Sequence, residues 1–280
     1  MMDLHAHTTA SDGTLSPTEL VLLARDVGLT ALAVTDHDTV EGVAEAIAAA
    51  EKTGLELVPG IEISVDYPHG ELHLLGYYVD PQNEAFLSRV TYLQENRANR
   101  NQVMVRRMQE LGIDVTWDDV LAEAGEGQVG RPHMARALVR KGYATSLPDA
   151  FERLVGDGKP LHVPKVRLDP REAIELVHQG GGAAVVAHPK YLGFDTEESL
   201  AAEIARLKEC GLDGLECYYS QHSEEETERF LRVARELSLV VTGGSDFHGT
   251  TKDSVRLGRV YRNRPLDPAL LGPIRAAAGR

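Results

Sequence analysis

Short apolar runs of strand length recur along the chain, and longer segments with helical periodicity separate them. The runs lie at residues 31–34, 55–58, 183–186, 212–217 and 239–241. Turn-forming or polar residues bound each run, and the connections between runs and helices are short. This alternation indicates an α/β fold with a parallel sheet, because a helical connection returns the chain to the same edge of the sheet.

Two of the helical segments carry clear start and stop signals. Ser16-Pro17-Thr18-Glu19 is a capping box with proline at the first helical position, and Gly28 is placed to end that helix. Asp169-Pro170-Arg171-Glu172 repeats the device with an acidic cap, and Gly180 is placed to end the second helix. These signals support helices between successive strands.

The alternation stops between residues 81 and 165, where the pattern is helical and shows no clear strand. Helices are predicted at residues 83–111, 116–124, 131–141 and 146–155, with the glycine-rich Gly125-Glu126-Gly127 between two of them. We therefore expect a helical insertion domain at 81–165. Residues 1–80 and 166–280 would together form the α/β body.

The composition is that of a soluble globular protein. The chain has 280 residues, of which 42% are hydrophobic and 26% charged. No basic and apolar leader begins the chain, and no apolar run approaches the roughly 20 residues of a membrane helix. We expect a cytoplasmic protein with no membrane partner, in which Cys210 and Cys217 are reduced thiols.

The net charge of −14 argues against nonspecific binding of long nucleic acid, which relies on basic surface. The charge is unevenly distributed. Residues 81–145 contain nine Lys/Arg and eight Asp/Glu, a net charge of +1, which leaves −15 for the remainder. A near-neutral cap over an acidic body could help to admit a small anionic substrate.

Histidine and carboxylate side chains recur at or just beyond the ends of the apolar runs. They are His5, His7, Asp12, His37, Glu62, His73, His188, Asp246 and His248. His5 and His7 point to the same side of an extended segment, and Asp246 and His248 have the same spacing. Such ligands at successive strand ends are typical of a multinuclear metal site. A barrel fits better than an open sheet, because it brings all strand ends to one face.

Taken singly, each motif also has a structural explanation. His188 precedes a proline and can be a hydrogen-bonded structural residue, and the Asp-Gly pair at Asp12 can be a turn. Asp36 or Asp38 can cap the following helix. The repetition of the same residue types at strand ends favours the metal site over a set of separate structural roles.

Seven motifs run from the first residues to about residue 250: His5-x-His7, Ser11-Asp12-Gly13, Thr35-Asp36-His37-Asp38, Gly60-Ile61-Glu62, Leu72-His73-Leu74-Leu75-Gly76, Ala187-His188-Pro189 and Gly244-Ser245-Asp246-Phe247-His248. Together they resemble the PHP (polymerase and histidinol phosphatase) family. The resemblance implies a distorted (β/α)7 barrel that binds two or three divalent metal ions (Mn, Fe or Zn) and hydrolyses phosphate esters. It implies that all nine residues named above are metal ligands.

The insertion, with Gly130-Arg131-Pro132-His133, further resembles the bacterial nucleotide-phosphatase and small exoribonuclease branch of that family. That branch removes the 3′-phosphate of 3′,5′-bisphosphonucleotides or trims short RNA from its 5′ end. The resemblance implies a small nucleotide or short oligoribonucleotide as substrate. The alternatives are a histidinol-phosphatase-like phosphomonoesterase, an amidohydrolase acting on a C–N bond, and a non-catalytic binding module. The last is disfavoured because all nine ligand positions are filled.

Three residues are expected to take part in catalysis. Glu62 and Asp246 would bind the metal ions that lower the pKa of the attacking water. His222, just after the 212–217 run, resembles a family site residue. We favour a substrate or leaving-group role for His222 over a role as helix cap.

Three further residues are candidate phosphate contacts. Arg131 can bind phosphate through two parallel hydrogen bonds, and His133 can donate to the same phosphate. Their alternatives are a surface arginine at a helix start and a cap-region histidine. Lys159 can add a contact, although a solvated loop lysine is the simpler interpretation. The remaining histidines are interpreted as structural or surface residues: His69, His162 and His178.

Overall fold

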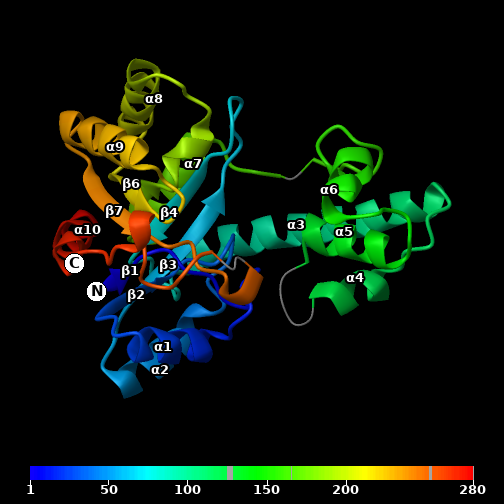
Figure 1. Ribbon diagram of the computed structural model, residues 1–280, viewed down its shortest axis with the longest axis horizontal. Coiled ribbons are helices and arrows are strands. Elements are labelled where there is room, and N and C mark those ends of the chain that lie inside the picture. Colours follow the sequence, from blue (N-terminus) through cyan, green and yellow to red (C-terminus); the bar gives the residue numbers. More distant parts are fainter. Residues whose placement is uncertain (125–128, 165, 252–253, 280) are drawn as a thin grey trace. The chain divides into compact units, whose positions relative to one another are not determined.

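The computed structural model describes residues 1–124, 129–164, 166–251 and 254–279. Its contacts divide the chain into two compact units (Figure 1). The barrel unit comprises Met1–Val90 and Arg167–Arg280, and the helical unit comprises Thr91–Val166. The first division falls inside the long helix α3 (Glu84–Glu110), which belongs to both units.

Seven strands form one sheet whose order in space is their order along the chain. They are β1 (Met2–Asp3), β2 (Ala31–Val34), β3 (Glu56–Ser64), β4 (His73–Tyr77), β5 (Ala183–Val186), β6 (Gly214–Tyr219) and β7 (Val240–Gly244). The sheet nearly closes beyond its first and last strands. There the His7 N–H donates to the Phe247 carbonyl at 2.9 Å, and the Asp246 N–H donates to the His5 carbonyl at 2.9 Å. The predicted distorted (β/α)7 barrel is confirmed.

One strand departs from the expected parallel sheet. β4 runs antiparallel to both β3 and β5, whereas the other neighbouring pairs are parallel. The reason lies in the connection: only residues 65–72 join β3 to β4. Eight residues are too few for a helical crossover, so the chain has to turn back on itself.

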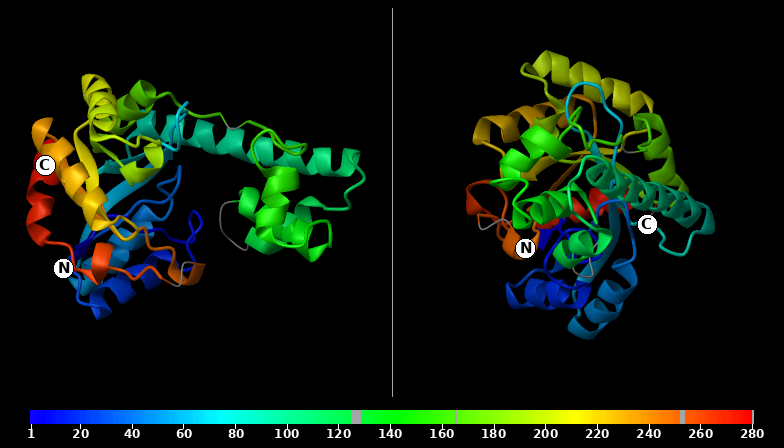
Figure 2. Two further views of the ribbon diagram at one scale, coloured as in Figure 1. Left: turned by 45° about the horizontal axis from the view of Figure 1, so that its top comes forward. Right: turned by 90° about the vertical axis from the view of Figure 1, so that its right-hand side faces the viewer.

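Helices pack on the outside of the strands in the barrel unit (Figures 1 and 2). They are α1 (Pro17–Asp26), α2 (Val43–Thr53), α7 (Pro170–Gln179), α8 (Glu197–Glu209), α9 (Glu224–Glu236) and α10 (Leu271–Ala277). Short 3₁₀ turns lie at Pro189–Leu192, Gly249–Thr251, Tyr261–Asn263 and Pro268–Leu270. Both predicted capping boxes are present, Ser16 with Glu19 and Asp169 with Glu172. These caps fix the residues at which α1 and α7 begin.

The helical unit consists of the rest of α3 with α4 (Trp117–Ala124), α5 (Arg131–Arg140) and α6 (Leu147–Ala150). Buried side chains between residues 104 and 161 give it a core of its own. The helix predicted at 146–155 is wrong in its second half, because a single π-helical turn at Phe151–Val155 follows α6. The glycine-rich segment at 125–127 lies outside the described residues.

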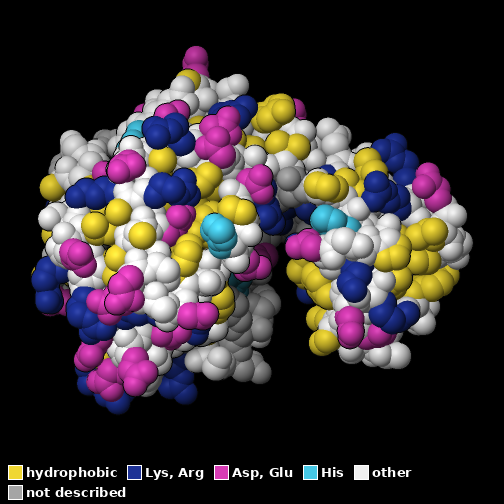
Figure 3. Space-filling view, turned by 90° about the horizontal axis from the view of Figure 1, so that it is seen from above, with side chains coloured by type: hydrophobic (Ala, Val, Ile, Leu, Met, Phe, Trp, Pro, Cys, Tyr) yellow, Lys and Arg dark blue, Asp and Glu magenta, His cyan; other side chains and the backbone are white. Residues whose placement is uncertain are grey.

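Two further expectations concern the whole chain. Among the described residues, no helix combines the length and the apolar character that a membrane span requires. Cys210 and Cys217 are both free thiols, as expected, and Cys217 is buried. On the face shown in Figure 3, Lys/Arg and Asp/Glu side chains are interspersed over the barrel unit.

Candidate metal centre

Glu62, on β3, lies fully buried among histidines from other elements. Its Oε2 atom is 3.3 Å from His5 Nε2 and 3.2 Å from His7 Nε2. The same oxygen is 3.0 Å from Nδ1 of His37, which follows β2. The sequence spacing correctly predicted that His5 and His7 point to one side, since both Nε2 atoms reach one carboxylate oxygen.

The other oxygen of Glu62 faces two more of the predicted ligands. Oε1 is 2.9 Å from Nδ1 of His73, the first residue of β4, and 3.0 Å from His188 Nε2. His188 follows β5 and has a backbone φ of +27°. A positive φ is uncommon outside glycine and is often found at functional sites, so the backbone here is held in a strained conformation that aims the ring at Glu62.

Asp246, just after β7, completes the first group. Its Oδ1 atom is 3.2 Å from His7 Nε2 and 3.6 Å from His5 Nε2. One donor atom from each of His5, His7, Glu62 and Asp246 lies within 4.8 Å of all the others. Asp246 has a φ of +57°, and a Cβ atom on Gly244 would lie 2.2 Å from the His5 Cβ. Glycine at 244 is therefore required for β7 to approach the segment after β1 that carries His5.

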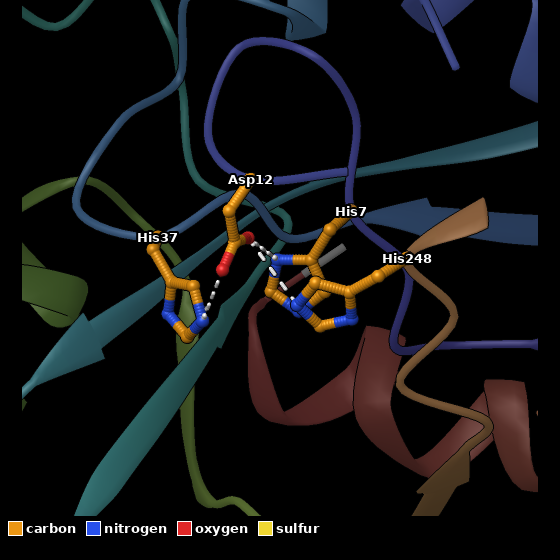
Figure 4. A group of neighbouring side chains, drawn as sticks. All are labelled: His7, Asp12, His37 and His248. Atoms are coloured by element: carbon orange, nitrogen blue, oxygen red, sulfur yellow. Dashed lines mark ion pairs between the residues drawn. The ribbon is translucent and has the colours of Figure 1, made fainter. Parts of the chain in front are cut away.

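A second group gathers around Asp12 (Figure 4). Asp12 Oδ1 is 3.2 Å from His248 Nε2 and 3.9 Å from His7 Nδ1, and its Oδ2 is 3.9 Å from His37 Nε2. His7 and His37 thus face Asp12 with one nitrogen and Glu62 with the other. A neutral imidazole offers a single lone pair, so neither ring can serve both groups without losing its ring proton. The arrangement fits two or three ions.

Asp36 holds the loop that carries Asp12. It accepts hydrogen bonds from the Thr8 N–H at 2.7 Å, from the Thr8 hydroxyl at 2.7 Å and from the Ser11 hydroxyl at 2.6 Å. Asp38 accepts from the backbone of β3 at 3.0 Å. Neither caps α2, whose N-cap residue is a glycine. The helix-cap interpretation of both aspartates is therefore wrong, and Asp36 helps to place a ligand.

The cluster has the properties of a site built for cations. His5 Nε2, His7 Nε2, His37 Nδ1 and Glu62 Oε2 are buried and have no hydrogen-bond partner among the described residues. Uncompensated buried polar atoms are costly, and divalent cations would satisfy them. A mixture of imidazole and carboxylate donors suits Mn, Fe or Zn. The residues present therefore fit two or three divalent ions.

Electrostatics within the cluster follow from burial and from the neighbouring charges. Burial raises the pKa of Glu62, but the surrounding histidines outweigh it and hold that pKa well below its usual range. Burial lowers the pKa of His7, but the adjacent carboxylates of Asp246 and Glu62 outweigh it and raise that pKa to about 10. Burial lowers the pKa of His37 to about 3. Nearby carboxylates also raise the pKa of His5 well above its usual range. Cation binding would displace protons from ligand nitrogens, chiefly those of His5 and His7.

His222 lies beyond β6 and is 5% exposed. Its Nδ1 is 3.0 Å from the Cys217 carbonyl oxygen, which can only accept, so Nδ1 carries the ring proton. Burial lowers the pKa of His222 to about 3, so the ring is neutral at physiological pH. Its Nε2 therefore has a lone pair, which is buried and has no hydrogen-bond partner among the described residues. The N-cap residue of the following helix α9 is Ser223, not His222.

The three candidate phosphate contacts lie in the helical unit. Arg131, the first residue of α5, pairs with Asp157 at 2.5 Å between Nη1 and Oδ1. His133 Nδ1 accepts the Gly130 N–H at 2.9 Å, so it does make the cap contact considered above. Lys159 is exposed on the loop after the π-helical turn. Their part in phosphate binding stays a prediction.

Sequence patterning missed Glu216 and Tyr219 on β6. Glu216 is fully buried and contacts His5 and the backbone of His188. The Tyr219 hydroxyl donates to Asp246 Oδ2 at 2.9 Å. The only signal in the sequence was a carboxylate inside the apolar 212–217 run, where a buried charge needs a partner.

Comparison with known proteins agrees with this geometry. The PHP domain matches the chain over residues 3–144. The 5′-3′ exoribonuclease of Haemophilus influenzae is 38% identical over 249 residues, which cover 88% of this chain and 89% of that protein. The 3′,5′-nucleoside bisphosphate phosphatase of Chromobacterium violaceum is 31% identical over 267 residues, with coverage of 95% and 93%. The crystal structure of a Bifidobacterium adolescentis protein assigned as a metal-dependent phosphoesterase superposes with a TM-score of 0.82 at 35% identity, covering 100% of this chain and 98% of that one.

Proposed function

This chain belongs to the PHP family of metal-dependent phosphoesterases, and we propose that it acts on small nucleotides. The proposed reactions are removal of the 3′-phosphate from 3′,5′-bisphosphonucleotides and trimming of short oligoribonucleotides from the 5′ end. The observation that carries the proposal is the buried cluster around Glu62, with histidines on both carboxylate oxygens. Relatives that match most of the chain are named for these two activities.

Nine residues are proposed to bind the metal ions. They are His5, His7, Asp12, His37, Glu62, His73, His188, Asp246 and His248. Divalent ions in such a centre lower the pKa of water and neutralise the oxygens of a phosphate ester. The chain contributes the geometry: Glu62 places both of its oxygens between ligand nitrogens, and the Asp36-anchored loop presents Asp12.

His222 is proposed to orient the substrate or the attacking water. Its Nε2 is free to accept a hydrogen bond from substrate or water, and because burial lowers the pKa of the ring to about 3, the ring is neutral near neutral pH. A neutral ring whose Nδ1 proton is bonded to the Cys217 carbonyl has no proton on Nε2 to give to a leaving oxygen. The proposed role of His222 is therefore to orient substrate or water rather than to act as a general acid.

Arg131, His133 and Lys159 are proposed to contact substrate phosphate. The support for Arg131 is local. Its guanidinium is paired with Asp157, whose side chain is 78% exposed, and a dianionic phosphate can compete for the same fork of N–H donors. An exposed ion pair holds its partners weakly, so the exchange costs little.

The charge of the chain argues for a small substrate. The excess of acidic residues repels a long nucleic acid, and on the visible face acidic and basic side chains alternate rather than forming a basic track (Figure 3). A short dianionic substrate can be bound by the cations and a few basic side chains alone.

The test is turnover of the metal-reconstituted protein on matched substrates. We expect 3′-phosphoadenosine 5′-phosphate and short 5′-phosphorylated oligoribonucleotides to be hydrolysed much faster than mononucleotides that lack one phosphate. Equal efficiency without the second phosphate would remove the proposed two-phosphate recognition. A preference for histidinol phosphate, or for an amide in a parallel panel, would replace the nucleotide proposal by the corresponding alternative.

A further inference from the structure

β6 carries none of the nine proposed ligands, yet two of its side chains contact three of them. Glu216 bonds to His5 and to the backbone of His188, and Tyr219 bonds to Asp246. Both side chains are at most 1% exposed. Strand β6 therefore supports ligands that come from three other parts of the barrel.

A bulge in β6 explains how both residues reach the centre. Glu216 and Tyr219 are three positions apart, so a regular strand would place them on opposite faces. Glu216 pairs with Thr242, whereas Tyr218 pairs with Gly243, so β6 has one residue more than β7 at this point. The extra residue restores the parity and turns both side chains to the same side.

The two oxygens of Glu216 have different partners. Oε1 is 3.0 Å from His5 Nδ1, and Oε2 accepts the His188 N–H at 2.7 Å. A carboxylate oxygen accepts, so Nδ1 of His5 carries a ring proton, and Nε2, which faces Glu62 and Asp246, is the nitrogen left to bind a cation. The bond thus selects the tautomer in which His5 can bind a cation.

We propose that Glu216 is a positioning residue that fixes the ring orientation of His5, keeps the ring proton on Nδ1 when a cation binds at Nε2, and holds the backbone of His188. Histidine ligands commonly have such a carboxylate partner, and losing it typically weakens metal affinity about 10–100-fold. The inference rests on the proposed metal centre, but not on the proposed substrate.

Glutamine cannot replace Glu216 despite its equal size. Glutamine offers one acceptor oxygen, whereas Glu216 accepts from two N–H groups. If the oxygen faces His188, the amide NH₂ faces His5 Nδ1 and forces the proton onto Nε2, where it blocks the cation. If the oxygen faces His5, the His188 N–H meets another donor, and the backbone that aims the His188 ring is displaced.

The experiment compares zinc affinity, measured by competition with a chromophoric chelator, in wild type, Glu216→Gln and Asp213→Asn. Asp213 is a matched control: it bonds to His178 Nε2 at 2.8 Å and accepts the Ala184 N–H at 2.7 Å, but touches none of the proposed ligands. We expect zinc to bind about 10–100-fold more weakly to Glu216→Gln and nearly unchanged to Asp213→Asn. Equal losses in both variants, or none in Glu216→Gln, would overturn the inference.

A second measurement needs no substitution at 216. In zinc-loaded wild type labelled with ¹⁵N-histidine, the two ring nitrogens of His5, assigned by their loss in His5→Asn, should show a protonated Nδ1. A protonated Nε2 would contradict the inference even if Glu216→Gln does not fold. Wild type that binds no zinc at all would instead contradict the proposed metal centre, so the two failures are distinguishable.

Discussion

Replacement of Glu62 by glutamine should remove metal binding and hydrolysis together. Both oxygens of this side chain are used: Oε2 has three histidine nitrogens within 3.3 Å, and Oε1 has two within 3.0 Å. An amide nitrogen has no lone pair for a cation. Whichever way the glutamine amide is turned, the contacts of one oxygen are lost.

The size of the effect can be bounded from the change at one oxygen. Turning a carboxylate oxygen into an amide nitrogen removes at least one charged contact to a cation, and a charged contact is worth about 1.5–3 kcal/mol. The expected loss is therefore at least about 1.5–3 kcal/mol of cation binding, or a roughly 10–10²-fold lower affinity. Turnover should fall at least as far at cation concentrations that saturate the wild type.

The assay combines elemental analysis of the purified protein with turnover on 3′-phosphoadenosine 5′-phosphate. Glu56→Gln is the matched control, because Glu56 lies on the same strand but pairs with Arg275. The control should retain metal content and activity. If Glu62→Gln kept wild-type metal content and turnover, the contacts of Glu62 would not be metal contacts, and the reasoning would be wrong.

Three further results are expected. Arg131→Ala should raise KM for nucleotide substrates with little change in kcat, a loss of about 1.5–3 kcal/mol in kcat/KM; unchanged kinetics on every phosphate ester would exclude this contact. Tyr219→Phe removes the hydroxyl bonded to Asp246 but keeps the ring packing, so kcat should fall about 10–100-fold at nearly constant Tm. A clear drop in Tm with unchanged kcat would indicate a purely structural role. The hydrogen bond to Asp213 raises the pKa of His178, so its stabilisation is present below the unfolded pKa of about 6.5 and is lost as pH rises through the higher folded value. Urea unfolding should therefore show a larger deficit in His178→Gln on the acid side of that window than at alkaline pH.

Sequence patterning predicted the strands that are apolar runs between turn signals. β2 and β5 occupy the predicted positions because every residue in them is buried, which leaves a continuous apolar run. β1 and β4 were not predicted as strands. β1 has only two residues, and β4 begins with a histidine that interrupts the apolar pattern.

The ligand motifs were predictable because each lies within a few residues of sequence. The side chains that hold the ligands in place were not predictable, because they come from distant parts of the chain. His5 and His7 are two residues apart, but Glu216 lies 211 residues from His5 along the chain. Hydrogen bonds of that separation depend on which strands become neighbours and on the bulge in β6, and neither can be derived from one sequence. The helical pattern at 146–155 also did not reveal that Phe151–Val155 forms a π-helical turn instead of an α-helix.

The central claim is that nine side chains gather two or three metal ions at one end of the barrel. A crystal structure of the metal-loaded protein, with anomalous data collected at the Mn, Fe and Zn absorption edges, tests it most directly. We predict two or three anomalous peaks roughly 2.0–2.3 Å from ligand atoms of Glu62, Asp246, Asp12 and the surrounding histidines. Peaks elsewhere, or a single ion that leaves Asp12 and His248 without a metal contact, would contradict the account.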